Sequence, residues 1–120
     1  MSAPSNYGRD NPAGLAQALG ELLEDHKGSD VAVLDLRDLG SWTDFFVIAT
    51  VSSRAHMEGL LRHLKDFARE QEVEILRRHR RIPPEEEWVL LDLGRVVVHL
   101  MTGKARSFYE LERLWGVGGR

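Results

Sequence analysis

The 120-residue chain contains no cysteine, which excludes disulfide bonds and metal sites with thiolate ligands. It also lacks a long hydrophobic run. The longest, FFVIATV at Phe45–Val51, falls far short of the roughly 20 apolar residues that a membrane-spanning helix needs. The opening residues, MSAPSNYGRDNP, lack the apolar core of a secretory signal. These absences favour a cytoplasmic protein that has no membrane partner.

The chain also lacks an excess of positive charge. It has 16 Lys and Arg against 19 Asp and Glu, a formal net charge of -3. A protein held to nucleic acid mainly by counterion release is usually basic, so only a local basic patch is expected to touch phosphate. The composition, 42% hydrophobic and 29% charged, is typical of one soluble globular domain. We expect this domain to span residues 11–115, between flexible ends at 1–10 and 116–120.

Three segments carry apolar residues at helical spacing. The first helix is predicted over residues 11–27, with Asn11 as its cap and Gly28 ending it in the left-handed conformation. The second follows two serines that can cap it and ends near Gln71. The third is predicted to begin at Ser107, in the capping box SFYE.

Runs rich in β-branched and aromatic residues, bounded by turn residues, predict the strands. They lie at Val31–Leu36, Phe45–Val51, Val73–Leu76, Trp88–Leu93 and Val96–Met101. The last two flank Gly94 and Arg95, a pair suited to a type II′ hairpin turn. The order of the elements predicts a single α/β or α+β domain, in which helices pack on a mixed sheet of about five strands.

The predicted hairpin has two unlike faces, because side chains alternate along a strand. Pairing Leu93 with Val96 joins two aliphatic sets into one dry face. The opposite face mixes apolar and polar groups, as surfaces that bind partners do: Trp88, Leu90, Asp92, Val97, His99 and Met101. A helix covering this face would instead make Trp88 an ordinary core residue.

Catalysis has little support in the sequence. Asp92 and His99 could form an acid–base pair, but no Ser or Cys nucleophile stands in a recognisable turn, and no Gly-rich phosphate loop precedes a helix. The segment LGSWTD offers Asp44 without the second carboxylate that a nucleotidyltransferase would use to hold magnesium. We therefore expect no enzyme activity, no cofactor and no metal. Asp35 and Asp44 are expected to satisfy turns.

Two further groups of residues allow more than one interpretation. His56 and His63 lie seven residues apart on the second helix and can share a face, but helical metal pairs favour a spacing of four, so solvated histidines are favoured. The segment RRHRR could contact ribosomal RNA phosphates or could be a solvated loop. Its arginines are Arg77, Arg78, Arg80 and Arg81.

Five motifs together resemble the ribosomal silencing factor family, also called RsfS or Iojap-like. They are TDFFVIAT, SSRAH, WVLLDLG, VVVHLM and RSFYELERLW, and they span about residues 31–115. The resemblance implies a small α/β protein, similar in fold to nucleotidyltransferases, that binds the large ribosomal subunit through ribosomal protein L-fourteen. Such a protein blocks docking of the small subunit and lowers translation when nutrients are short.

The resemblance also bears on the candidate contact residues. It implies that Leu93 reaches the partner, and it places Arg95 where the family commonly has an acidic residue. On the third predicted helix Tyr109 points away from the apolar stripe and Arg106 precedes the helix, so both are candidate contacts. The predicted function is a ribosome-binding translational repressor; the alternatives are a nucleotidyltransferase-like enzyme and a small RNA-binding module. The sequence leaves open whether the free protein is a monomer or a homodimer.

Overall fold

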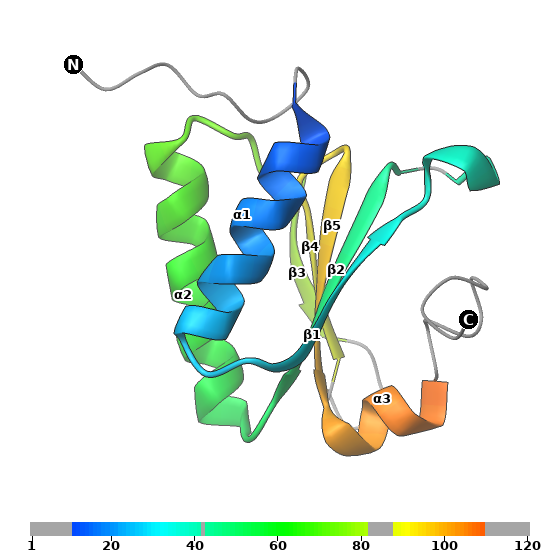
Figure 1. Ribbon diagram of the computed structural model, residues 1–120. Helices are drawn as coiled ribbons and strands as arrows, with labels where there is room; N and C mark the ends of the chain where they lie inside the picture. The colour runs from blue at the N-terminus through cyan, green and yellow to red at the C-terminus, as the bar shows by residue number, and fades with distance from the viewer. Residues whose placement is uncertain (1–10, 42, 82–87, 110–120) are drawn as a thin grey trace.

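The computed structural model describes residues 11–41, 43–81 and 88–109. Five strands form one sheet in the order β1-β2-β5-β4-β3 (Figure 1). Their bounds are β1 Ser29–Asp35, β2 Phe45–Val51, β3 Arg77–Arg81, β4 Trp88–Asp92 and β5 Val96–Thr102. β2 and β5 run parallel at the centre, and the other neighbouring strands are antiparallel. The predicted mixed sheet of about five strands is confirmed.

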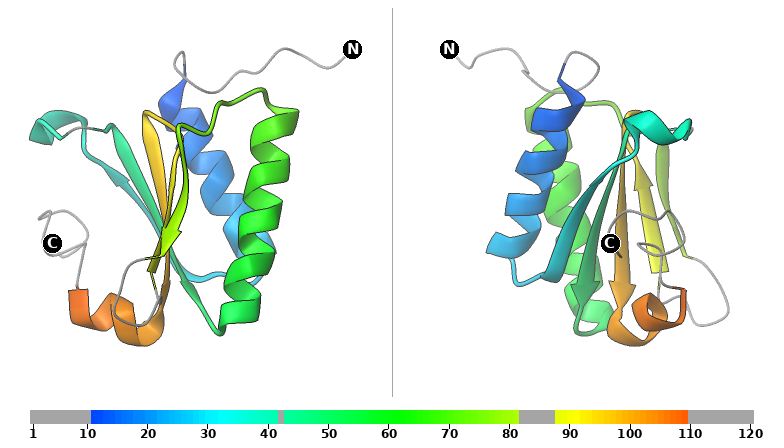
Figure 2. Two further views of the ribbon diagram at one scale, coloured as in Figure 1. Left: turned by 180° about the vertical axis from the view of Figure 1, so that it is seen from behind. Right: turned by 45° about the vertical axis from the view of Figure 1, so that its right-hand side comes forward.

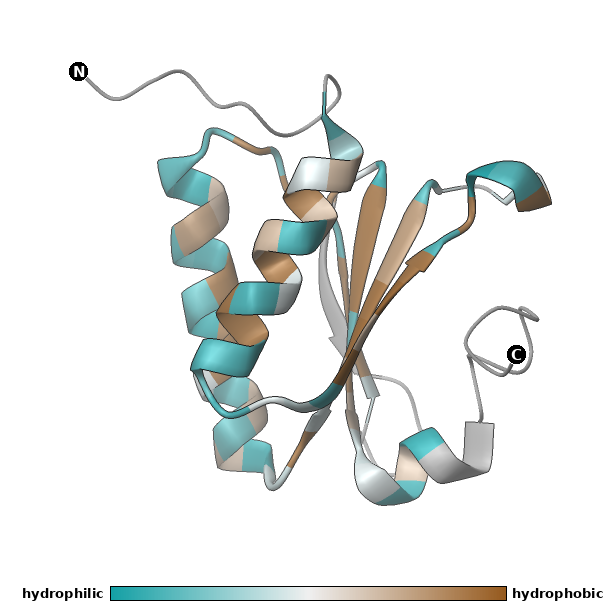
Figure 3. Cartoon of the chain, viewed as in Figure 1, coloured by the Kyte–Doolittle hydropathy of each residue, from teal (hydrophilic) through white to brown (hydrophobic). Residues whose placement is uncertain are grey.

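Two helices, α1 (Pro12–Asp25) and α2 (Arg54–Glu70), lie side by side on one face of the sheet (Figures 1 and 2). In both helices, hydrophobic residues lie along the side that faces the strands (Figure 3), and many of them belong to the buried core. Those of α2 that are buried are Met57, Leu60, Leu61, Leu64 and Ala68. Removing one leucine side chain of this size from water stabilises a fold by about 1.5–3 kcal/mol. This layer therefore forms the main core.

The two long helices begin as predicted. The side chain of Asn11 accepts a hydrogen bond from the backbone N–H of Gly14 at 2.9 Å, and Pro12 occupies the first helical position. Ser53 caps α2 in the same way, accepting from the N–H of His56 at 3.0 Å. Each cap satisfies a donor that the first turn of a helix leaves unpaired.

Both helices end in a Schellman motif. After α1, Lys27 takes the left-handed conformation with φ 73°, and the N–H of Gly28 donates to the carbonyl of Leu23 at 2.7 Å. After α2, Glu72 has φ 58° and the N–H of Val73 donates to Ala68 at 2.8 Å. The prediction that Gly28 takes the left-handed position is wrong by one residue.

The same motif explains why the predicted strand at Val73–Leu76 is wrong. Val73 packs back on the helical core as the residue that closes α2, so its apolar character serves the helix end. The strand begins only at Arg77, where the chain pairs with β4. The segment RRHRR, expected to be a loop, is the edge strand β3.

The final described helix, α3 (Gly103–Tyr109), also begins earlier than predicted. The hydroxyl of Thr102 accepts a hydrogen bond from the N–H of Ala105 at 3.1 Å and so acts as the cap. Ser107 lies inside the helix, and the fourth residue of the predicted capping box lies outside the described residues. Within the part of the chain that the structure describes, no helix is long and apolar enough to cross a membrane.

Candidate partner-binding hairpin

The hairpin of β4 and β5 has the predicted register. Asp92 pairs with Val97, and the N–H of Leu93 donates to the carbonyl of Val96 at 2.9 Å, which leaves a two-residue turn. Gly94 has φ 94°, as the first central residue of a type II′ turn requires. Asp92 Oδ1 accepts from the N–H of Gly94 at 2.8 Å. Asp92 therefore closes the turn.

The two flanking aspartates also have structural partners. Arg95 in the turn donates to Asp44, with Nη2 and Oδ2 2.6 Å apart. This bond engages the carboxylate that a nucleotidyltransferase would need for magnesium. Asp35 accepts from the backbone and guanidinium of Arg37, and the hydrogen bond from that side chain lowers the pKa of Asp35. The prediction that these aspartates satisfy turns is confirmed for Asp35, which accepts from the N–H of Arg37. It is wrong for Asp44, whose carboxylate pairs with the side chain of the distant Arg95.

The aliphatic face of the hairpin packs under α1 and α2. Its residues Val89, Leu91, Leu93, Val96, Val98 and Leu100 all belong to the main core. Leu93 is 6% exposed, which leaves little of its side chain to reach a partner. The predicted division of the hairpin into one dry face and one mixed face is therefore confirmed, while contact through Leu93 stays a prediction.

The mixed face divides between its two strands. On β5, Val97 and Met101 are fully buried and His99 is 3% exposed. On β4, Trp88, Leu90 and Asp92 stay partly exposed. The buried members join a second core cluster with Phe46, Ile48 and Ala105. His99 lies on the face predicted to meet a partner, but it is buried, because the rings of Phe46 and Trp88 pack against it.

His99 has a defined set of neighbours. Its Nδ1 accepts a hydrogen bond from the indole N–H of Trp88 at 3.0 Å, and the ring of Phe46 meets it edge-on with centroids 4.4 Å apart. Burial lowers the pKa of His99 to about 3, so the ring is neutral at physiological pH. Since His99 bonds to Trp88 and Asp92 bonds to the turn, the hypothesis of a catalytic Asp92–His99 pair gains no support from the geometry.

The register places the candidate contacts at opposite ends of the sheet. Trp88 lies opposite Met101, beside the start of α3, whereas Arg95 lies at the far turn. Arg106 lies inside α3 and not before it, and its guanidinium donates to the backbone carbonyl of Asp30 and to the hydroxyl of Thr50. Tyr109 is the last residue of α3. The structure therefore groups Trp88 and Leu90 with the α3 end of the sheet and separates them from Arg95.

Comparison with known proteins decides the family. The model of the family described as "Ribosomal silencing factor during starvation", RsfS, matches residues 9–119. This chain belongs to the RsfS family. The family is one of translation regulators, so the chain is a regulatory protein by descent, as the five sequence motifs predicted.

Several relatives support this assignment. The chain is 40% identical to the ribosomal silencing factor RsfS of Treponema pallidum over 85% of this chain and 90% of the relative. It is 33% identical to the chloroplastic protein Iojap of Arabidopsis thaliana over 97% of this chain and 48% of that protein. A crystal structure of a Chromobacterium violaceum protein matches with a TM-score of 0.76 and 34% identity, covering 87% and 86% of the two chains.

In this RsfS protein, the arginines predicted to touch RNA lie on β3 at the edge of the sheet. Arg77 pairs with Asp92 and Arg80 with Leu90, with a shift in register between them. Neighbouring strands flank β3 on one side only. Contact between this strand and ribosomal RNA stays a prediction.

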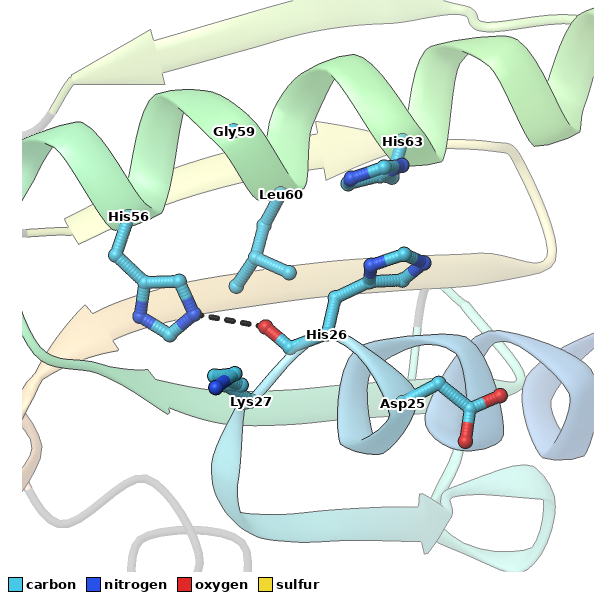
Figure 4. A pocket seen from close by; sticks show the side chains of 7 residues that line it. All are labelled: Asp25, His26, Lys27, His56, Gly59, Leu60 and His63. Carbon is cyan, nitrogen blue, oxygen red and sulfur yellow. Dashed lines mark hydrogen bonds between the residues drawn. The ribbon is translucent and has the colours of Figure 1, made fainter.

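On the opposite face of the domain, three histidines of this RsfS protein line a pocket of about 210 Å³ between α1 and α2 (Figure 4). The imidazole of His56 accepts from the N–H of Ser52 at 3.1 Å and donates to the carbonyl of His26 at 2.9 Å. His26 and His63 stack with centroids 3.7 Å apart. The expectation of a solvated histidine is wrong for His56, which ties the start of α2 to the end of α1. The spacing of residues in the sequence does not predict that His26 lies against His56 and His63.

This arrangement does not resemble a metal centre. Both ring nitrogens of His56 are already bonded, and stacked rings direct their nitrogen lone pairs in parallel planes, so these do not converge on one point. Figure 4 shows Asp25 pointing away from the three imidazoles. Among the described residues, no group of three or more His, Asp or Glu side chains is placed to hold a metal ion.

Proposed function

We propose that this protein binds the large ribosomal subunit through ribosomal protein L-fourteen and sterically blocks joining of the small subunit. Translation then falls when nutrients are limited, and no turnover or cofactor is involved. The main support is the partial exposure of Trp88 and Leu90 on the sheet face opposite α1 and α2. Large aromatic side chains at such positions are the usual anchors of protein interfaces.

The surface around Trp88 and Leu90 suits a protein that acts by binding and blocking a partner, and not by catalysing a reaction. Trp88 offers contact area with few rotamers to lose, and Leu90 follows it on the same face of β4. The nearby polar groups are engaged: Asp92 in the turn and His99 with Trp88. Such a surface can hold a partner, and the two polar groups described on this hairpin face, Asp92 and His99, are both engaged in structural hydrogen bonds.

Sedimentation of purified subunits on sucrose gradients tests the proposal. The protein should migrate with the large subunit and not with the small one. When added before the subunits are mixed, it should reduce the fraction that joins. Binding to the small subunit alone, or binding to the large subunit without any loss of joined ribosomes, would contradict the proposal.

A further inference from the structure

We infer that His99 is a positioning residue for the ribosome contact: its Nδ1 holds the indole of Trp88 in the orientation that meets the partner. This inference rests on the proposed function and assigns a role to a group that the proposed contact surface does not itself expose. It depends on three observations, which concern the register of the hairpin, the fixed environment of His99 and an unsatisfied donor on its ring.

Because of the hairpin register, Trp88 and His99 are diagonal neighbours and not directly opposed residues. Trp88 lies directly opposite Met101, and His99 lies opposite Leu90, so the indole must lean along the sheet to reach His99. The ring centroids are 5.8 Å apart with planes tilted by 41°, which is not a stacked pair. The 3.0 Å hydrogen bond from the indole N–H to Nδ1 therefore defines where the N–H edge of the indole lies.

His99 itself is held firmly. It pairs with Ile48 on one side and Leu90 on the other, in the interior of the sheet. The ring of Phe46 packs edge-on against it. An acceptor fixed by two neighbouring strands and an aromatic ring can orient a side chain that is only partly buried, as Trp88 is.

The third observation is that packing alone does not favour a histidine here. Because Nδ1 accepts from Trp88, the ring proton lies on Nε2, and Nε2 has no hydrogen-bond partner within the described residues. A buried donor without a partner destabilises a fold, whereas an aliphatic side chain would not. The acceptor at Nδ1 supplies a reason for this residue.

A side chain that anchors an interface binds more tightly when it is already oriented before the complex forms. A side chain that is already held in its bound rotamer loses less freedom when the complex forms, which raises affinity without any new contact. The hydrogen bond from Trp88 to Nδ1 of His99 favours one rotamer of the indole before the partner binds. His99 thus acts through Trp88 and needs no contact with the ribosome.

Two variants of His99 test the inference. His99→Leu removes the acceptor, and His99→Asn restores one, since the amide oxygen of Asn is bonded to the same γ carbon as Nδ1 of His. In His99→Leu the indole N–H resonance of Trp88 in a ¹H–¹⁵N spectrum should move, and affinity for the large subunit should fall about three- to tenfold, the effect of losing one neutral hydrogen bond. His99→Asn should recover most of both.

A second background separates positioning from packing. Trp88→Phe keeps an aromatic ring but has no N–H to donate, so in this background His99→Leu should leave affinity unchanged. The inference is overturned if the indole resonance does not move in His99→Leu. It is also overturned if the resonance moves but His99→Leu binds with parental affinity. If His99→Leu fails to fold, His99→Phe in both backgrounds gives the same comparison, because it keeps a ring but also removes the acceptor. Parental affinity of Trp88→Ala would instead refute Trp88 as the anchor, which is a failure of the proposed function.

Discussion

Asp44 and Arg95 stand 51 residues apart in the chain, yet their ion pair joins the start of β2 to the turn of the β4–β5 hairpin. The backbone carbonyl of Arg95 also accepts from the N–H groups of Asp44 and Phe45 at 3.0 Å. Arg95 in the turn therefore has a partner of opposite charge in Asp44.

Removing this ion pair should have a small effect on stability. Side chains of Arg95 and Asp44 are 49% and 24% exposed, and pairs at such positions contribute about 0.2–1 kcal/mol. We expect Arg95→Gln and Asp44→Asn each to lower the free energy of unfolding by about this amount. Urea denaturation of the two single variants and of the double variant gives the coupling energy between Arg95 and Asp44. A coupling near zero would mean that the ion pair does not help to hold the turn.

At the ends of the two long helices, introducing a glycine should stabilise the fold at one position, whereas replacing the glycine at the next position should destabilise it. Lys27 and Glu72 hold a left-handed conformation that glycine adopts without steric cost. Lys27→Gly and Glu72→Gly should therefore each stabilise the fold by about 0.5–1 kcal/mol. Gly28→Ala should destabilise it, because the new Cβ would lie 2.9 Å from the carbonyl oxygen of Leu23. Thermal unfolding distinguishes these outcomes, and a stabilising Gly28→Ala would contradict the assigned motif.

Burial of His99 makes stability depend on pH. Its pKa is about 3 in the folded protein against an ordinary value near 6.5, so between these values the unfolded chain binds the proton and the folded chain does not. The free energy of unfolding is therefore not reduced by His99 above about pH 6.5. Below that pH it falls, by about 1.4 kcal/mol per pH unit at most. Urea denaturation from pH 7 to 4 should show a shallower loss for His99→Leu than for the parent. Equal slopes would contradict the burial of His99.

Most of the sheet could be predicted from sequence because its signals are local. The two-residue turn at Gly94 and the alternation along β4 and β5 specify the register without knowledge of distant contacts. The strand at RRHRR could not be predicted in this way. Its residues are charged, and only pairing with β4 makes them a strand, while the apolar Val73 belongs to a helix end.

The candidate site was predictable only in part, for a related physical reason. Period-two alternation assigns Trp88 and His99 to one face of the hairpin, but it does not tell how deeply each strand is covered. The rings of Phe46 and Trp88 pack against His99 and bury it, whereas Trp88 at the start of β4 stays partly exposed. The bond of His56 to His26 depends on how α1 and α2 pack, which no short motif encodes.

The arginines of β3 give a prediction about salt. If Arg77, Arg78, Arg80 and Arg81 contact ribosomal phosphates, each lost contact should flatten the dependence of affinity on salt concentration. We expect the variant with all four changed to Gln to bind the large subunit more weakly at low salt and with a shallower slope. Arg62→Gln with Arg69→Gln, on the exposed side of α2, serves as the control for charge alone. An unchanged slope in the β3 variant would exclude an RNA contact through this strand.

Trp88→Ala tests the anchor itself. An interface hot spot should cost about 2 kcal/mol or more of binding, roughly thirtyfold in affinity, whereas a fully buried core tryptophan would cost about 3–5 kcal/mol of folding. Because Trp88 is partly exposed, we expect the loss of binding to exceed the loss of stability. Leu39→Ala is a suitable control, since Leu39 is 43% exposed in the short helix η2 (Arg37–Leu39), at the opposite end of the sheet. Sedimentation with the large subunit and thermal unfolding should be measured on both variants. If Trp88→Ala unfolds far below the parent, or binds like Leu39→Ala, then Trp88 is not the anchor and the ribosome contact lies on another surface.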